Sequence, residues 1–217
     1  MSDPYYDEGY HARRHKALIE DEEYFRARAE ASARFYFAPA ELGVRVFEYG
    51  CGIGQGIAAL PNAAGWDVSS EAREACRRRG LRVFDRLEDI PPAAWDIVFC
   101  RHVLEHVEDP LDALRAMRGL VAGGGELRLI LPREGHAAAS FDPDLDQHLY
   151  CWNFRAANNL LRRAGFAPFA NEEKYILGYR ALLPLRRALG PGVYYHAARL
   201  VGRLYGNGEL LIRARPF

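Results

Sequence analysis

Several features that mark other classes of protein are missing from this sequence of 217 residues. Its 29 Lys and Arg residues are balanced by 29 Asp and Glu residues, so the formal net charge is zero and the basic excess typical of nucleic-acid-binding proteins is absent. No apolar run approaches the roughly 20 residues of a membrane-spanning helix, and the polar start MSDPYYDEGY lacks the apolar core of a signal peptide. We therefore expect a cytoplasmic protein with no nucleic-acid partner.

Cysteine is also scarce. The four cysteines, Cys51, Cys76, Cys100 and Cys151, form no C-x-x-C pair, which is the spacing of many zinc and redox sites. Reduced thiols in a cytosolic protein are favoured over a disulfide framework. The P-loop signature G-K-[ST] does not occur either, so the sequence does not indicate a phosphate-binding loop of that type.

Strand and helix patterns alternate from residue 44 onward, which predicts an α/β fold with right-handed crossovers. We expect a Rossmann-like, doubly wound, mostly parallel seven-stranded sheet, and the chain length suits one domain, residues 1–217. Its predicted parts are a helical arm or lid (1–40), a core (41–175), a helical insert (176–207) and a last strand (208–217). The expected strands are 44–49, 65–68, 81–84, 95–100, 126–131, 166–175 and 209–215.

Capping residues predict where the helices begin. Ser69 or Ser70, Asp109 and Asn153 each precede a helical pattern, and Pro110 suits the first helical position after Asp109. A short helix is also expected at residues 54–60, and a turn at residues 123–125.

A glycine-rich loop follows the first expected strand and is the most informative segment. Glycines alternate at positions 50, 52 and 54, but the dinucleotide fingerprint G-x-G-x-x-G fails because Gln55 and Ile57 occupy its last position in the two possible registers. A nicotinamide oxidoreductase is therefore disfavoured. Glu48, just before the loop, would repel a pyrophosphate and attract an ammonium or sulfonium group.

A second carboxylate, Asp67, falls at the end of the second expected strand. At that position in such folds an acidic side chain can accept hydrogen bonds from both ribose hydroxyls. Taken alone, Asp67 is just as well explained as a turn residue before a helix. Together with Glu48 and the loop, it favours a binding role.

Four segments in order carry a resemblance to a known family. Glu48, Gly50, Gly52 and Gly54 match the pattern [DE]-x-G-x-G-x-G of the class I S-adenosylmethionine-dependent methyltransferases. The segments HVLEHVEDP (102–110), GGGEL (123–127), and HLYCW with LLRRAGF (148–152 and 160–166) resemble those of the ubiquinone-biosynthesis O-methyltransferase type. The resemblance covers most of the chain.

The resemblance implies that S-adenosylmethionine is the cofactor and S-adenosylhomocysteine the product. It places Glu48 near the methionine ammonium, the loop under the methionine and ribose, and Asp67 on the ribose. The family often has an Asp near the adenine where this chain has Arg86; the backbone N–H of Leu87 could serve there instead. The implied cofactor-binding residues are Glu48, Gly50, Cys51, Gly52, Gly54, Asp67, Val68, Leu87, Cys100 and His102.

The methyl acceptor is expected to be a small molecule, with oxygen as its reacting atom. A phenol or alcohol acceptor benefits from a base, most often histidine, and His106 and His148 are the candidates. His102 and His106 could instead serve only to orient the loop after the fourth strand. Tyr10 and Tyr150 are expected to contact the substrate. The alternatives are methylation of nitrogen or carbon, or a catalytically silent cofactor-binding subunit.

No metal is expected, although residues 102–106 match the H-x-x-E-H pattern of some zinc peptidases. That pattern requires a sustained helix, and here it follows a strand directly. A loosely held divalent ion that assists a catechol-like acceptor is the more reasonable metal hypothesis.

The insert at 176–207 contains five arginines and no acidic residue. Val193, Ala197, Leu200, Val201 and Leu204 form one helical face, and His196, Arg199 and Arg203 form another. The insert could bind an anionic substrate, contact a membrane, form a homodimer, or present an ordinary solvated basic surface. The N-terminal arm, with Tyr5, Tyr6 and Tyr10, could be a lid or could simply pack on the sheet.

Overall fold

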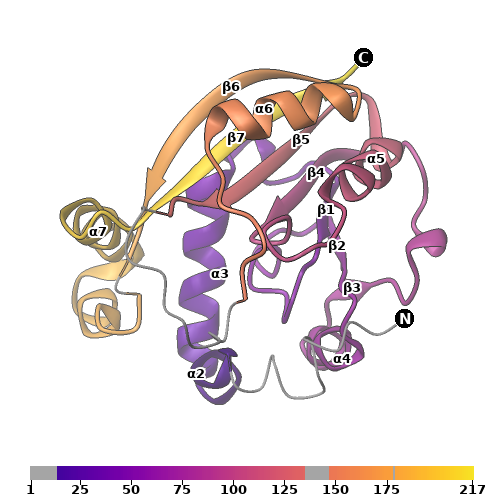
Figure 1. Ribbon diagram of the computed structural model, residues 1–217. Helices are drawn as coiled ribbons and strands as arrows, with labels where there is room; N and C mark the ends of the chain where they lie inside the picture. Colours follow the sequence, from indigo (N-terminus) through magenta and orange to yellow (C-terminus); the bar gives the residue numbers. More distant parts are fainter. Residues whose placement is uncertain (1–13, 135–146, 178) are drawn as a thin grey trace. The chain divides into compact units, whose positions relative to one another are not determined.

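The computed structural model describes residues 14–134, 147–177 and 179–217. They group into two compact units, Met1–Ile90 with Tyr175–Asn207, and Pro91–Lys174 with Gly208–Phe217. Seven strands follow the order β3-β2-β1-β4-β5-β7-β6 (Figure 1). The expected α/β fold with a mostly parallel sheet is confirmed, while the extent of the predicted single domain and its four parts stays a prediction.

The first unit contains the parallel strands β1 (Val46–Tyr49), β2 (Ala63–Trp66) and β3 (Arg82–Val83). All four side chains of β1 are buried, as expected of a strand covered on both faces. Helix α4 (Ser70–Arg78) begins where the Ser69 hydroxyl accepts a hydrogen bond from the backbone N–H of Ala72 at 3.2 Å, so the predicted cap is confirmed. Two short 3-10 helices, η1 (Pro39–Glu41) and η2 (Leu87–Asp89), complete this region.

The helical arm consists of α2 (Lys16–Glu20) and α3 (Glu22–Tyr36), and the insert forms α7 (Leu183–Leu204). The Arg79 guanidinium on α4 stacks 4.0 Å from the centroid of the Phe25 ring on α3. On the other side, α3 pairs with α7 through Arg186 and Glu30, 2.7 Å apart. These contacts hold the arm in place within its own unit.

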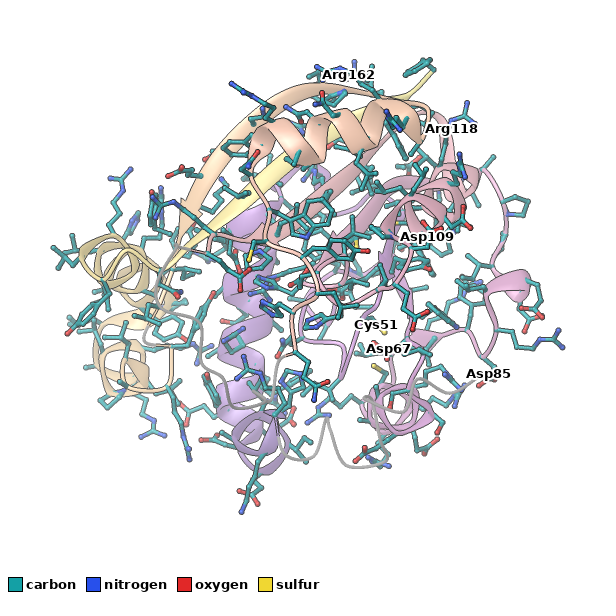
Figure 2. The ribbon with its side chains drawn as sticks, viewed as in Figure 1. Cys51, Asp67, Asp85, Asp109, Arg118 and Arg162 are labelled. Carbon is teal, nitrogen blue, oxygen red and sulfur yellow. The ribbon has the colours of Figure 1, made fainter. Side chains whose placement is uncertain are left out.

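The second unit contains β4 (Trp95–Arg101), β5 (Val121–Pro132), β6 (Phe166–Tyr175) and β7 (Gly208–Pro216). Strands β4 and β5 are parallel, and β7 runs antiparallel to β5. Helices α5 (Pro110–Leu120) and α6 (Phe154–Arg163) start at the predicted caps, Asp109 and Asn153. Arg118, labelled in Figure 2, donates hydrogen bonds to the carbonyls of Gly165 (3.0 Å) and Phe217 (2.6 Å).

Two local expectations were wrong. Residues 54–60 form successive turns rather than a helix, because Gly54 has φ of 85°, outside the helical region. Residues 123–125 lie inside β5 rather than in a turn before it: Trp95 pairs with Val121 and Ile97 with Glu126, so the extra glycines form an irregularity in the ladder.

Among the described residues, no helix combines the length and the hydropathy needed to cross a bilayer.

Candidate active site

The glycine loop has a backbone conformation that only glycine adopts readily. Gly50, Gly52 and Gly54 have φ of 74°, 51° and 85°, all in the left-handed region. The loop is tied to the end of β2, because the N–H groups of Gly50 and Cys51 both donate to the Trp66 carbonyl, at 2.8 and 3.0 Å. The three left-handed glycines alternate with Cys51 and Ile53 at the carboxyl end of β1, where Gly50 and Gly52 are only partly buried.

Asp67 fixes this loop as well as ending β2. Its Oδ2 accepts a hydrogen bond from the Gly52 N–H at 2.7 Å, and its Oδ1 accepts one from the Ser69 N–H at 2.9 Å. The side chain is buried and lies beside Cys51 in Figure 2. Asp67 thereby ties the glycine loop to the start of α4 through two backbone donors.

Glu48 is a buried carboxylate on β1. Its side chain lies against Gly56, where a Cβ atom would overlap the carboxylate oxygens. Gly56 is therefore needed to leave room for Glu48. The structure brings Glu48, the glycine loop and Asp67 together in one unit, and their role in binding a cofactor stays a prediction.

Two thiols pack under the loop. Cys76 Sγ donates to the Gly52 carbonyl at 3.3 Å, and Cys51 Sγ lies 3.8 Å from the same oxygen. The hydrogen bond to the Cys76 thiol, together with burial, raises the pKa of the Cys51 thiol well above its usual value. A raised pKa disfavours the reactive thiolate of Cys51, so this buried thiol supports the loop by packing rather than by acting as a nucleophile.

The other cofactor candidates of this unit lie near the strand ends. Val68 directly follows Asp67 and is 52% exposed, which leaves an apolar surface accessible to a ligand. Leu87 begins η2. The Arg86 side chain turns to Glu88, with its Nε 2.6 Å from Oε1, so it is used in a local ion pair.

His102 lies in the second unit, immediately after β4, with φ of 53°. Its ring bridges two buried carboxylates: Nε2 is 2.9 Å from Glu209 Oε1, and Nδ1 is 3.2 Å from Glu105 Oε1. Burial by itself lowers the pKa of His102, but the hydrogen bonds with Glu105 and Glu209 outweigh it, and the pKa is raised overall. Cys100, also predicted to bind cofactor, is fully buried in β4.

The two candidate bases, His106 and His148, lie close together. Their ring centroids are 4.8 Å apart in an edge-on arrangement. Nδ1 of His148 lies 2.5 Å from Glu134 Oε1, which orients the ring. Tyr150 donates its hydroxyl to the Glu108 carbonyl at 2.9 Å, so it fixes the segment after His148. Tyr10 lies outside the described residues.

Glu105, His106 and His148 could also hold a metal ion. Each offers a ligand atom, and these atoms lie within 4.8 Å of one another. Glu105 is fully buried, and its Oε1 lies 3.2 Å from His102 Nδ1 and 3.9 Å from His106 Nε2. A buried carboxylate is stabilised by a nearby positive charge. The His102 imidazole, whose pKa is raised, supplies part of that charge.

Sequence reasoning did not single out three carboxylates beside these histidines, Glu105, Glu134 and Glu209. Glu105 was noticed only within the segment 102–110 and within the zinc-peptidase pattern, without a role of its own. Glu134 follows the end of β5, and its position at the carboxyl end of a parallel strand was a usable signal. Glu209 lies 107 positions from its partner His102, and only the fold reveals that pairing.

Comparisons with known proteins bear on this site. A family model described as a methyltransferase domain matches residues 11–170. The ubiquinone biosynthesis O-methyltransferase of Methylococcus capsulatus is 36% identical over 97 residues, 38% of this chain and 41% of that protein. The Vibrio cholerae protein of the same name is 33% identical over 101 residues, 39% of this chain and 40% of that protein. The match thus spans about two fifths of the length of these curated relatives.

Solved structures share the fold at low sequence identity. Haemonchus contortus phosphoethanolamine N-methyltransferase 2, solved with phosphomonomethylethanolamine and S-adenosylhomocysteine, has a TM-score of 0.57 at 17% identity, covering 88% of this chain and 52% of that chain. Burkholderia thailandensis 1,6-didemethyltoxoflavin-N1-methyltransferase also has a TM-score of 0.57, at 18% identity, covering 96% of this chain and 84% of that chain. At these identities the likeness is one of fold.

Proposed function

Because the chain belongs to the methyltransferase-domain family, we propose that it transfers a methyl group from S-adenosylmethionine to an oxygen atom of a small molecule. The observation that carries the proposal is the left-handed glycine loop hydrogen-bonded to Asp67. The geometry of Glu48, Asp67 and the exposed Val68 supports the same ligand. These residues lie in one unit and need no rearrangement to be near one another.

The residues fit this cofactor by charge and by hydrogen-bonding capacity. Asp67 would accept hydrogen bonds from the ribose hydroxyls, because a carboxylate can accept from several donors at once. Glu48 would meet the methionine ammonium, and the loop backbone would pack against the ligand without side chains between them. When bound, S-adenosylmethionine supplies an electrophilic methyl group on a sulfonium centre.

His148 is proposed as the general base that takes the proton of the acceptor hydroxyl. The 2.5 Å contact between its Nδ1 and Glu134 Oε1 fixes the ring and leaves Nε2 as the proton acceptor. A base positioned in this way contributes roughly 10²–10⁴-fold to the rate. His106, edge-on to His148, would position that ring, and Tyr150 would fix the segment that carries it.

Oxygen is preferred over nitrogen because an oriented base is of most use to a hydroxyl, whose proton must leave as the bond forms. The relatives named as O-methyltransferases support the same choice. The neighbours in fold named as N-methyltransferases keep nitrogen as the main alternative.

A divalent cation bound by Glu105, His106 and His148 is a second candidate chemistry for the same acceptor. The observation that favours it is the buried Glu105 carboxylate close to two imidazoles. Such an ion would lower the pKa of a coordinated hydroxyl. Treatment with EDTA separates the two: turnover by a base alone survives chelation, whereas turnover with a cation is lost and returns when the metal is added back.

Methyl transfer from S-adenosylmethionine labelled in the methyl group tests the proposal against phenols, catechols, amines and carbon acids. We expect label on oxygen, and a loss of roughly 10²–10⁴-fold for His148→Ala with cofactor affinity retained. His196→Ala, which removes an exposed histidine of α7, is the matched control. Label on nitrogen or carbon contradicts the choice of acceptor atom. Cofactor binding without transfer to any acceptor indicates a silent subunit.

A further inference from the structure

Helix α7 buries a face that its hydrophobic pattern did not predict. The sequence indicated an apolar face that includes Val193, Leu200 and Leu204. In the structure the buried residues of this half of the helix are instead Tyr194, Ala198 and Gly202. The contact is close: the Leu177 N–H donates to the Ala198 carbonyl at 3.0 Å, and a Cβ at Gly202 would lie 2.6 Å from Ile176 Cα.

Most of the predicted apolar face is consequently left in solvent, although its fifth member, Val201, is half-buried. Val193, Leu200 and Leu204 are exposed, Leu200 by 59% and Leu204 by 74%, and Ala197 lies between them on the same side of the helix. Spaced three or four residues apart, the four side chains form a stripe about 16 Å long, at 1.5 Å per residue. Exposed leucine is ordinary singly, but a continuous stripe marks a contact surface.

Basic side chains border this stripe. His196, Arg199 and Arg203 are exposed along one side of it, and the sequence between Lys174 and Gly208 contains no acidic residue. Arg186 and Arg187, earlier in the helix, are paired with Glu30 and Glu23 of α3. In the described part of the chain, no ion pair joins Arg199 or Arg203 to a carboxylate.

We propose that the outer face of α7, defined as Val193, Ala197, Leu200 and Leu204 with the bordering Arg199 and Arg203, binds the surface of an anionic lipid membrane. A helix lying in the interface buries an apolar stripe among the acyl chains while its basic side chains meet the lipid phosphates. Helix α7 carries both the apolar stripe and the basic side chains. The proposal does not depend on which molecule accepts the methyl group.

Charge favours a membrane over a second copy of the chain. If two copies of the chain paired through this stripe, Arg199 and Arg203 of both copies would lie along the same apolar interface. The segment carries no acidic residue to pair with them, so the contact would bring like charges together. Anionic headgroups provide the missing negative charge.

Vesicle flotation tests the proposal with the full chain. We expect binding to vesicles of phosphatidylcholine with phosphatidylglycerol, little binding to phosphatidylcholine alone, and weakening by salt. Leu200→Glu with Leu204→Glu should abolish binding, and Arg199→Gln or Arg203→Gln should each weaken it by about fivefold, the effect of one basic residue near an anionic surface. Ile19→Glu, at an exposed apolar residue of α2, and Arg163→Gln, at an exposed arginine of α6, are the matched controls.

The arginine variants keep the test decisive if the double glutamate variant does not fold, because they change only exposed charges. Absence of binding to anionic vesicles overturns the proposal, and so does equal binding to neutral ones. Equal loss in the control variants also overturns it. Sedimentation velocity is measured in parallel: a wild-type dimer that Leu200→Glu converts to a monomer, without vesicle binding by the wild type, assigns the surface to a second copy instead.

Discussion

Replacing Asp67 by alanine perturbs the cofactor site at the side chain that serves both the loop and the proposed ligand. In the structure its two oxygens accept hydrogen bonds from the N–H groups of Gly52 (2.7 Å) and Ser69 (2.9 Å). Hydrogen bonds to a charged group contribute about 1.5–3 kcal/mol each. Alanine removes these two bonds and also the acceptors expected for two ribose hydroxyls.

Loss of even one of the ribose bonds weakens binding of S-adenosylmethionine by at least about tenfold, since about 1.4 kcal/mol corresponds to a factor of ten. Asp67→Asn keeps one acceptor oxygen and should therefore fall between the wild type and Asp67→Ala. Asp112→Ala, which removes an exposed aspartate paired with Arg115, is the matched control and should leave the affinity unchanged.

Isothermal titration calorimetry measures the affinity, and urea unfolding of the same samples measures the cost to the fold. If Asp67→Ala binds S-adenosylmethionine within twofold of the wild type, the ribose is held elsewhere. If its affinity falls only in proportion to an unfolded fraction, Asp67 supports the loop without contacting the ligand. Either result refutes the reasoning.

Three further perturbations follow from the contacts described. Glu134→Gln removes the charged partner of His148 and should lower kcat with cofactor affinity unchanged; an unaltered kcat would exclude an oriented base. Glu126→Ala removes a buried carboxylate that pairs with Arg128 at 2.6 Å and with Arg213 at 2.8 Å, and it should cost about 3–5 kcal/mol in urea unfolding; a loss below about 1 kcal/mol would show that these pairs are unimportant. Because the pKa of His102 is raised, its stabilising charge is complete below the unfolded value of about 6.5 and is lost as the pH rises through the folded value. The stability difference between the wild type and His102→Gln should therefore be largest below about pH 6.5 and shrink as the pH rises above it, and a constant difference would contradict the assignment.

Local signals in the sequence were sufficient for most elements of the fold. Ser69, Asp109 and Asn153 each accept the capping hydrogen bond that their position predicted. The strand at residues 166–175 was predicted with the bounds that the structure has. Buried strands are short apolar runs between turn residues, so their pattern depends little on tertiary context.

Predictions failed where tertiary contacts outweigh local pattern. The glycines at 123–125 were predicted to form a turn, but they belong to β5, which pairs with β4 on both sides of them. The apolar residues of α7 were predicted to share one face of the helix, with its contact left open. In the structure Tyr194, Ala198 and Gly202 are the buried residues of that half of the helix, and Gly202 allows close packing against Ile176. Hydrophobic periodicity identifies an amphipathic helix and does not show which face will find a partner.

The candidate site was predictable to the extent that it is local in sequence. The glycine loop and Asp67 lie 17 positions apart or less and follow a recognisable pattern. The carboxylates that surround the histidines are separated from them by up to 107 positions, and no periodicity relates them. Their pairing depends on the order of the strands in the sheet. The sequence predicted the fold class and did not predict that order.

The central claim is that the glycine loop and Asp67 bind S-adenosylmethionine. Its most direct test is calorimetric titration of the wild-type chain with S-adenosylmethionine, S-adenosylhomocysteine and NAD under one set of conditions. The account predicts saturable binding of the first two with one site per chain and no heat from NAD. Tight binding of NAD, with no response to S-adenosylhomocysteine, would contradict it.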